Sequence, residues 1–183
     1  MAAGDARRFG SNKLTAPVDG KSMIRRALDA VPADRLEAVC VVTQYDQVEA
    51  LAGEYGFLCV RNDRPDLGLS RTVRLGAEAL ADRCGAIMFL VADQPLLRLE
   101  SVEGLLDCYL DHPDRIVSAA HGGVRGNPCV FPARFFPELC ALEGDVGGSA
   151  VIRRHGDALL LRETEEEQLT DVDTPEALEQ LRK

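Results

Sequence analysis

The 183-residue sequence lacks the motifs of several common enzyme classes. It contains no Gly-x-Gly-x-x-Gly stretch, which a nicotinamide dehydrogenase would need to bind its dinucleotide. Gly20-Lys21-Ser22 resembles the end of a P-loop, but Thr15 stands where that motif requires its first glycine. The sequence therefore gives no direct support to a nicotinamide dehydrogenase or to a P-loop hydrolase.

Cysteine pairs at metal spacing and long apolar runs are also missing. The six cysteines are dispersed, without Cys-x-x-Cys or a histidine at ligand spacing, which argues against zinc and disulfide frameworks and favours small buried residues. The longest apolar runs, such as residues 86–92, have the length of a strand, and no signal peptide precedes the first loop. We therefore expect a cytoplasmic protein without a membrane partner.

Charge is unevenly distributed along the chain. The first 26 residues carry six Lys or Arg against two Asp or Glu, and the rest carries 15 against 28, within a net charge of −9. An acidic body disfavours binding to nucleic acid. The basic end can still hold a small anion, especially with a divalent metal between the anion and the protein.

This basic N-terminal segment has the composition of a triphosphate-binding loop. Small residues at Ala2, Ala3 and Gly4 let backbone N–H groups approach a ligand closely. Arg8 can hold a phosphate through two parallel hydrogen bonds, and Lys13 can act as a mobile point charge on the outer phosphates. Taken alone, so short a stretch supports a basic tail without a ligand about equally well.

Apolar periodicity predicts alternating helices and strands within one domain. The predicted helices span residues 22–31, 44–54, 70–83, 99–110 and 134–142, with a further helix ending at about residue 155. Ser70 is the expected N-cap of the third helix. The predicted strands span residues 38–43, 57–60, 86–92, 115–120, 129–131 and 158–161. Residues 121–128 are expected to form a loop and residues 163–167 a solvated charge run, and the alternation predicts a mainly parallel sheet.

Two acidic segments are placed for chemistry. Asp93 follows the most apolar predicted strand, and ligands of an open parallel sheet lie beyond the carboxyl ends of its strands. A turn before a proline is the alternative explanation for Asp93. Near the other end of the chain, Asp171 and Asp173 precede Thr174 and Pro175. A helix start explains the threonine and the proline, but it does not explain the two acids.

Seven motifs follow one another along the chain: Ala2-Ala3-Gly4 with Arg8 and Lys13, Gly20-Lys21-Ser22-Met23, the loop from Asn62 to Thr72, Ala92-Asp93-Gln94-Pro95, Gly126-Asn127-Pro128, Gly144-Asp145-Val146-Gly147-Gly148 and Asp171-Val172-Asp173-Thr174-Pro175. Each would be a weak signal, but the ordered set resembles the molybdenum cofactor cytidylyltransferase family, of the MobA-like nucleotidyltransferase fold. The resemblance implies that residues 1–183 form one nucleotidyltransferase domain. Its expected fold is α/β and Rossmann-like, with a mainly parallel sheet and helices on both faces.

The sequence departs from the family pattern in places. Ala6 and Thr72 stand where the family has serine, and Ser22 and Asp63 stand where it has proline. A larger departure lies at the start, because the family has a hydrophobic strand ahead of its Ala-Ala-Gly loop, and here Met1 directly precedes that loop. We expect this first strand to be missing from the 183-residue chain, with poor folding or weak CTP binding as the result.

The resemblance implies transfer of CMP from CTP to the terminal phosphate of the molybdenum cofactor, a molybdopterin, with release of pyrophosphate. In such a reaction one phosphate attacks another, so the protein supplies alignment and neutralises charge and needs no nucleophile of its own. The nucleotide would be bound by Arg8, Lys13 and Asp93, which would also act in catalysis. The backbone of Ala2, Ala3 and Gly4 would bind the nucleotide as well.

The remaining site residues also follow from the resemblance. Asp93 and Asp173 would hold Mg²⁺, which prefers few carboxylates together with phosphate oxygens and water. Ser70 would contact the base or the ribose. Three residues are candidates for the pterin side, although loops of this composition are often plain turns: Arg125, Asn127 and Asp145.

Several alternatives stay open at this point. The preference for cytosine over guanine rests only on Ala-Ala-Gly, where guanylyl relatives have a more glycine-rich opening. The protein could instead be a relative that uses GTP or that acts on a sugar or polyol phosphate. It could also be a non-catalytic carrier of the cofactor, or an inactive remnant without its first strand. A molybdenum hydroxylase is the candidate recipient of the product. Pyrophosphate release from CTP and from GTP, with and without cofactor, distinguishes these alternatives.

Overall fold

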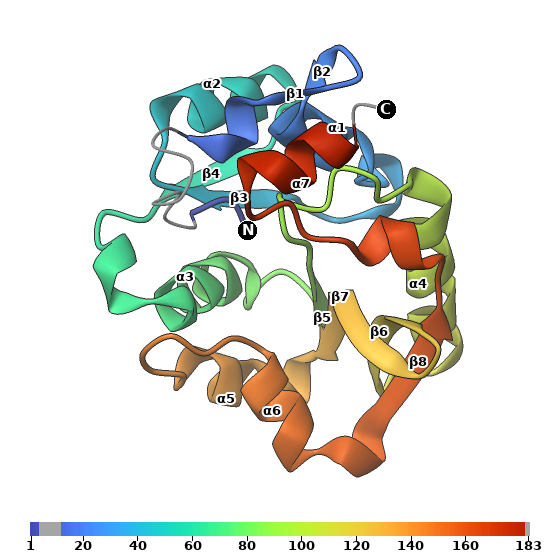
Figure 1. The fold of residues 1–183 in the computed structure, drawn as a ribbon. Coiled ribbons are helices and arrows are strands. Elements are labelled where there is room, and N and C mark those ends of the chain that lie inside the picture. The colour runs from blue at the N-terminus through green and yellow to red at the C-terminus, as the bar shows by residue number, and fades with distance from the viewer. Residues whose placement is uncertain (4–11, 182–183) are drawn as a thin grey trace.

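The computed structural model describes residues 1–3 and 12–181 (Figure 1). Its helices are α1 (Met23–Asp29), α2 (Asp46–Glu54), α3 (Leu69–Leu80), α4 (Leu99–Asp111), α5 (Phe136–Cys140), α6 (Ser149–Arg154) and α7 (Pro175–Gln180). Its strands are β1 (Pro17–Val18), β2 (Lys21–Ser22), β3 (Cys40–Thr43), β4 (Leu58–Arg61), β5 (Ala86–Phe89), β6 (Ile116–His121), β7 (Val124–Pro132) and β8 (Leu159–Glu163). Among the described residues, none of these helices has the length and apolarity needed to cross a membrane.

The strands form a mixed arrangement and not the mainly parallel sheet expected. β3 pairs with β4 in parallel, and a second sheet has the order β5-β7-β6-β8. β6 and β8 are parallel, but β7 runs antiparallel to both β5 and β6. The expectation of parallel strands therefore holds for β3/β4 and β6/β8 and fails at β7.

The reason for the failure is a tight hairpin between β6 and β7. Gly122 and Gly123 have φ angles of 56° and 78°, the left-handed pair that a two-residue hairpin turn requires. The carboxylate of Glu163 accepts hydrogen bonds from both glycine N–H groups, at 3.0 and 3.3 Å. Residues 121–128, expected to be a loop, are thus the end of one strand, a turn and the start of the next.

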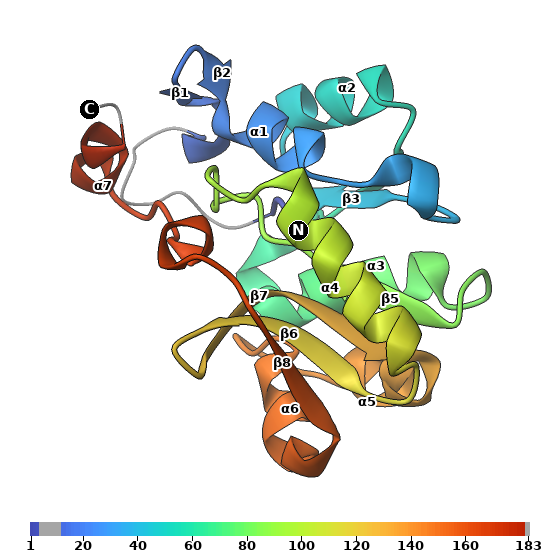
Figure 2. The same cartoon turned by 90° about the vertical axis from the view of Figure 1, so that its right-hand side faces the viewer.

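Helices cover both faces of the β5–β8 sheet, as expected (Figures 1 and 2). On one face α4 packs through Leu105 against Val117 of β6 and Val130 of β7. On the other face, α3, α5 and α6 pack on a buried cluster around Phe89 and Phe131, whose ring centroids lie 5.9 Å apart. The two helix layers bury the sheet on both sides, which stabilises it through the removal of apolar surface from water.

The cysteines are less buried than expected. Cys129 is buried, and burial raises the pKa of its thiol. The other five, Cys40, Cys59, Cys84, Cys108 and Cys140, are only partly buried.

Two helices are capped by a serine or threonine side chain, but Ser70 is not the cap that the sequence predicted. The Ser22 hydroxyl accepts from the N–H of Arg25 at 3.4 Å, and Thr174 caps α7 by accepting from Ala177 at 3.2 Å. Ser70, however, is not the N-cap of α3, because the helix begins at Leu69 and Gly68 occupies the cap position. The Ser70 N–H instead donates to the carbonyl of Gly144 at 3.2 Å.

Gly68 is required by this junction. Its φ is +87°, and a Cβ placed there would lie 2.5 Å from the Gly144 carbonyl oxygen. We expect Gly68→Ala to lower the free energy of unfolding by at least about 2 kcal/mol, since left-handed backbone costs a non-glycine residue roughly 1–2 kcal/mol before the clash is added. Urea denaturation of the variant measures the loss.

Gly144→Ala is the matched control. Its φ is also left-handed, at +71°, but a Cβ there meets no atom within 4 Å. It should therefore show the backbone cost alone. Equal losses in the two variants would mean that the contact between Gly68 and Gly144 adds nothing to stability.

Met1 and Ala2 lie in the gap between β3 and the segment that follows β5. The Met1 amine donates to the Leu90 carbonyl at 2.6 Å, and the Ala92 N–H donates to the Met1 carbonyl at 3.1 Å. On the other side, the Ala2 N–H donates to the Val42 carbonyl at 2.9 Å. The start of the chain therefore pairs with both neighbours, although β3 and β5 belong to separate sheets.

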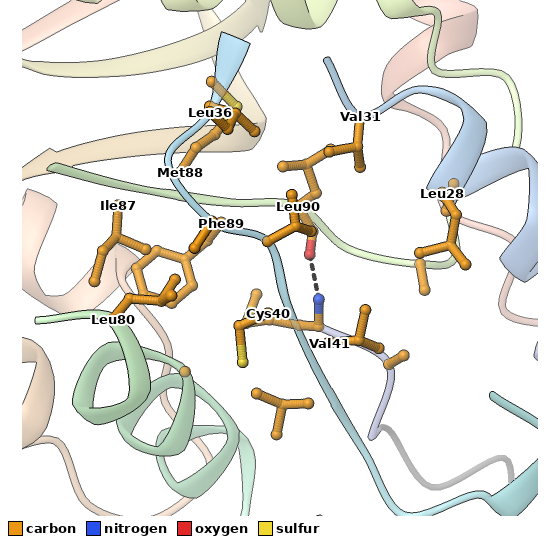
Figure 3. Close-up of a pocket in the computed structure, with 18 of the residues that line it drawn as sticks. Leu28, Val31, Leu36, Cys40, Val41, Leu80, Ile87, Met88, Phe89 and Leu90 are labelled. Carbon is orange, nitrogen blue, oxygen red and sulfur yellow. Dashed lines mark hydrogen bonds between the residues drawn. The ribbon is translucent and has the colours of Figure 1, made fainter. Parts of the chain in front are cut away.

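The same gap holds an apolar cavity of about 160 Å³, which we call the β3–β5 cavity (Figure 3). Its walls come from β3, β5, α1 and α3, and they include Leu28, Cys40, Val41, Leu80, Ile87 and Phe89. Burial among these groups lowers the pKa of the Met1 amine below its ordinary value of 8.0. The cavity thus has mostly apolar walls, with the buried Met1 amine at its end.

Candidate active site

A cleft of about 560 Å³ opens beyond the carboxyl end of β5. Residues 91–93 form one wall, and residues 1–3 line the cleft beside them. Further lining comes from Lys13, from the segment between β4 and α3, and from Asp145 and Asp173. The cleft lies where ligands of such sheets bind, which agrees with the position expected for Asp93.

Lys13 joins the polar groups of this cleft. Its Nζ donates to Asp93 Oδ2 at 2.9 Å, to Asp173 Oδ1 at 2.9 Å and to the carbonyl of Val172 at 3.1 Å. The Lys13 side chain is 13% exposed, against 26% for Asp93 and 60% for Asp173. Three predicted site residues, separated by up to 160 positions in the chain, therefore meet at one point.

The electrostatics of this meeting point favour a permanent positive charge on Lys13. Burial acts to lower the pKa of Lys13, but the hydrogen bond to Asp173 and the charge of Asp93 outweigh it and raise the pKa. Asp171 lies nearby and behaves differently. Burial and the charge of Asp93 raise the pKa of its carboxyl group, against a hydrogen bond that Gln94 donates to it at 2.9 Å.

Backbone contacts hold the two metal-ligand candidates in place. The Val172 N–H donates to the carbonyl of Asp93 at 2.8 Å, which ties the segment before α7 to the segment that follows β5. Gln94 is buried and its amide also donates to the carbonyl of Leu169 at 3.1 Å. These bonds fix the position of Asp173 relative to Asp93 independently of either carboxylate.

Lys13 opens a short 3₁₀ helix, Lys13–Thr15, that positions its main chain. The Asn12 side chain accepts from the Leu14 N–H at 3.1 Å as the N-cap, and the Leu14 side chain is buried against α1 and β3. The main chain of Lys13 is therefore fixed, whereas the four-carbon side chain can change rotamer.

The opening Ala-Ala pair is held at the end of β3. The Thr43 hydroxyl donates to the Ala2 carbonyl at 3.0 Å, and the Gln44 amide donates to the Ala3 carbonyl at 3.0 Å. Both alanines line the cleft. Gly4 and Arg8, the other predicted nucleotide-binding residues of this loop, lie outside the described residues.

The remaining predicted site residues are not all at the cleft. Asp145 lines it, and its carboxylate accepts from the Leu69 N–H at 3.3 Å. Ser70 is buried in the first turn of α3, 4% exposed, and its neighbours Gly68 and Leu69 line the cleft in its place. Asp145 therefore lines the same cleft as Lys13 and the two acids, whereas Ser70 lies behind the cleft wall.

Arg125 and Asn127 lie on β7 and are absent from the described lining of this cleft. The Arg125 guanidinium is 4.0 Å from the sulfur of Cys129, and that sulfur is 3.8 Å from the Asn127 amide oxygen. The structure does not bring these two residues together with Asp145.

Sequence reasoning missed the role of Asn62 and Thr72. The Asn62 side chain is buried, with 1% of its surface exposed. Its oxygen accepts hydrogen bonds from the Arg64 N–H at 3.2 Å and from the Arg71 guanidinium at 3.0 Å. Its NH₂ group donates to the Thr72 hydroxyl at 3.1 Å. Thr72 in turn lines the cleft, as does Asp66. An Asn that begins a turn-rich loop is the one available signal, because its side chain commonly bonds to backbone two residues on.

A divalent cation suits Asp93 and Asp173. Both carboxylates already contact one nitrogen at 2.9 Å, so one cation between them can contact both. In the part of the chain that the structure describes, no three His, Cys, Asp or Glu side chains converge into a metal cage. Two carboxylates with open positions fit magnesium, which retains water and takes up phosphate oxygens.

Comparison with known proteins gives matches over most of the chain. A family model described as MobA-like NTP transferase domain matches residues 1–159. The sequence is 28% identical over 197 aligned residues to the purine catabolism protein PucB of Bacillus subtilis (strain 168), covering 100% of this chain and 94% of PucB.

Solved structures show the same fold. Rv0371c from Mycobacterium tuberculosis H37Rv has a TM-score of 0.80 at 20% identity, covering 99% of this chain and 94% of that one. Another structure of Rv0371c is a complex with manganese. The molybdopterin-guanine dinucleotide biosynthesis protein A of Archaeoglobus fulgidus has a TM-score of 0.72 at 17% identity, with coverages of 99% and 94%.

Proposed function

The chain belongs to the MobA-like NTP transferase family, and on that basis we propose that it transfers CMP from CTP to the molybdenum cofactor and releases pyrophosphate. The observation that carries the proposal is the meeting of Lys13, Asp93 and Asp173 at one end of a cleft beyond β5. A nucleotidyltransferase needs a cation-lined cleft that can align two phosphates, and it needs no side-chain nucleophile.

In this mechanism the chain's own residues bind and orient the triphosphate. Lys13 donates to the outer phosphates and stabilises the departing pyrophosphate, together with Arg8 of the opening loop. Ala2 and Ala3, small and fixed to β3, let the triphosphate approach the backbone closely. Asp93 and Asp173 would hold Mg²⁺, which supplies charge neutralisation on the phosphate oxygens when bound. The manganese complex of Rv0371c supports a divalent ion at this fold.

The acceptor would enter from the side of the cleft lined by Leu69 and Asp145. Asp145 is the pterin-side candidate whose position agrees best with this direction. Arg125 and Asn127 would have to act from β7, away from the described lining of the cleft. Ser70 would contribute to base or ribose binding by shaping the first turn of α3, where its side chain is buried.

We expect pyrophosphate release with molybdenum cofactor to be at least tenfold faster from CTP than from GTP, and to require magnesium. A factor of ten corresponds to about 1.4 kcal/mol of transition-state discrimination. The small residues Ala2 and Ala3 motivate the choice of cytosine. A coupled pyrophosphate assay with purified cofactor measures both rates.

The other outcomes of this assay each select a different function. Faster release from GTP would overturn the cytidylyl assignment, and the guanine dinucleotide protein of Archaeoglobus fulgidus is the observation that favours this second candidate. Release with a sugar or polyol phosphate in place of the cofactor would change the acceptor. Binding of cofactor without any metal-dependent release would indicate a carrier.

A further inference from the structure

The Lys13 ammonium lies where a metal ion would contact both acids. Three oxygens surround its Nζ: one from Asp93, one from Asp173 and the carbonyl of Val172, at 2.9, 2.9 and 3.1 Å. All are acceptors, and two carry charge. Oxygen ligands of this kind are also those of magnesium and manganese.

We infer that Lys13 is a placeholder for the divalent cation: it pairs with Asp93 and Asp173 in the metal-free protein and moves away when the metal arrives. The inference rests on the proposed function, because it takes the two acids as the metal ligands. It adds an exchange of partners to the role of Lys13 on the phosphates.

The exchange follows from electrostatics at short range. The ammonium and a divalent ion cannot both sit between the same carboxylates, because their mutual repulsion is strong at a few ångströms and weakly screened in a partly buried site. Without any cation, however, Asp93 and Asp173 would face each other as like charges. Lys13, at 13% exposure, removes that repulsion as long as no metal is bound.

The structure gives Lys13 the means to move. Its main chain is fixed by the Asn12 cap and by the N–H of Ala16, which donates to the Lys13 carbonyl at 3.0 Å. Only the flexible side chain must turn, and the cleft of about 560 Å³ that it lines offers the space. A triphosphate in the cleft would then supply new acceptors for the ammonium.

This exchange couples metal binding to nucleotide binding. Metal alone must displace Lys13 from its partners, so the metal binds weakly to the free protein. A bound nucleotide offers phosphate oxygens as new acceptors to the displaced lysine, so nucleotide binding strengthens metal binding. By linkage, metal binding strengthens nucleotide binding by the same factor. The site would thus take up its metal efficiently only together with substrate.

The test is a titration of the full chain with Mn²⁺ in the absence of nucleotide, in which electron paramagnetic resonance measures the concentration of free Mn²⁺. We expect Lys13→Met to bind Mn²⁺ at least tenfold more tightly than the unchanged protein. Lys21→Met is the matched control, since Lys21 is exposed and pairs with Asp29 at 2.7 Å away from the cleft. It should leave the Mn²⁺ affinity unchanged.

A double variant keeps the result specific. Lys13→Met with Asp93→Asn should lose the gain, because one of the two ligands is then neutral. An unchanged or weaker Mn²⁺ affinity of Lys13→Met, in a protein whose thermal melt shows that it is folded, overturns the inference. So does a gain that persists in the double variant.

The outcome is separate from that of the transfer reaction. Mn²⁺ binding is read without turnover, so a tighter Lys13→Met variant in a protein that releases no pyrophosphate from CTP would keep the exchange and remove the proposed function. If the protein transfers CMP from CTP but its Lys13→Met variant binds Mn²⁺ no more tightly, the proposed function stands and the exchange is removed.

Discussion

Replacing Asp93 or Asp173 by asparagine should lower turnover by at least about 100-fold, which corresponds to roughly 2.7 kcal/mol of transition-state stabilisation. The proposed metal would lose one of its two charged ligands in either variant. The free energy of unfolding should change by less than about 1 kcal/mol, because Lys13 keeps the other acid as its partner and both acids are at least partly exposed. Steady-state pyrophosphate release and thermal melts measure the two effects.

Asp46→Asn is the control for these variants. Asp46 is an exposed acid in the first turn of α2 and pairs with Arg61, away from the cleft. It should leave turnover unchanged. If Asp173→Asn retained full turnover and lowered the melting temperature, Asp173 would serve the start of α7 and not the metal.

Filling the β3–β5 cavity should produce the largest gain in stability. We expect a designed extension of five residues ahead of Met1, with four large apolar side chains, to pair with β3 and β5 and to raise the free energy of unfolding by about 3 kcal/mol. Burial of the four side chains contributes roughly 6–12 kcal/mol. Ordering five residues costs about 5–10 kcal/mol, and the new ladder hydrogen bonds add about 1 kcal/mol each.

The pH dependence of stability gives a second readout of the same extension. Burial lowers the pKa of the Met1 amine in the folded 183-residue chain, so the unfolded chain binds the proton more strongly. Stability should therefore rise as the pH rises from the lowered pKa to about 8.0, the ordinary value, and level off above it. The extension replaces the amine by a neutral amide, and this slope should disappear.

An extension of equal length made of Gly, Ser and Asp is the control, since it cannot fill an apolar cavity. Urea midpoints and CTP affinities of the three proteins measure the effect. Equal midpoints for the apolar and polar extensions would show that the cavity does not accept a strand. The expected strand ahead of the Ala-Ala-Gly loop remains a prediction, and the gap between β3 and β5 is where it would pair.

Much of the fold could be predicted because it is encoded locally. Apolar residues three and four positions apart predict the helices α1 and α4, and Thr174 and Pro175 predict the start of α7. Only the second half of β7 was predicted, as a strand over residues 129–131, because the first half is partly exposed and carries Arg125, Gly126 and Asn127, which hide the strand pattern. The Gly122-Gly123 pair was the available hairpin signal.

The candidate site was likewise only partly predictable from local sequence. Asp93 was placed by a local rule, after an apolar strand, whereas the role of Asp173 followed from the family resemblance. Their common contact with Lys13 joins residues 80 and 160 positions apart, and no local pattern encodes it. The contact between Gly68 and Gly144 also joins residues far apart in the chain, and for that reason the start of α3 and the environment of Ser70 were predicted wrongly.

The bond from the Val172 N–H to the Asp93 carbonyl limits how the C-terminal segment can be replaced. Asp173 lies beyond residue 159, where the match to the family model ends, and its segment is held beside residues 93–94 by this main-chain bond and by the bond from the Gln94 amide to the Leu169 carbonyl. The Val172 side chain is also fully buried against Val18, Met23 and Leu178, so position 172 requires an apolar residue as well as a free main-chain N–H. A tail taken from a relative should therefore bring its acid to the position of Asp173 only if it keeps an apolar residue at position 172.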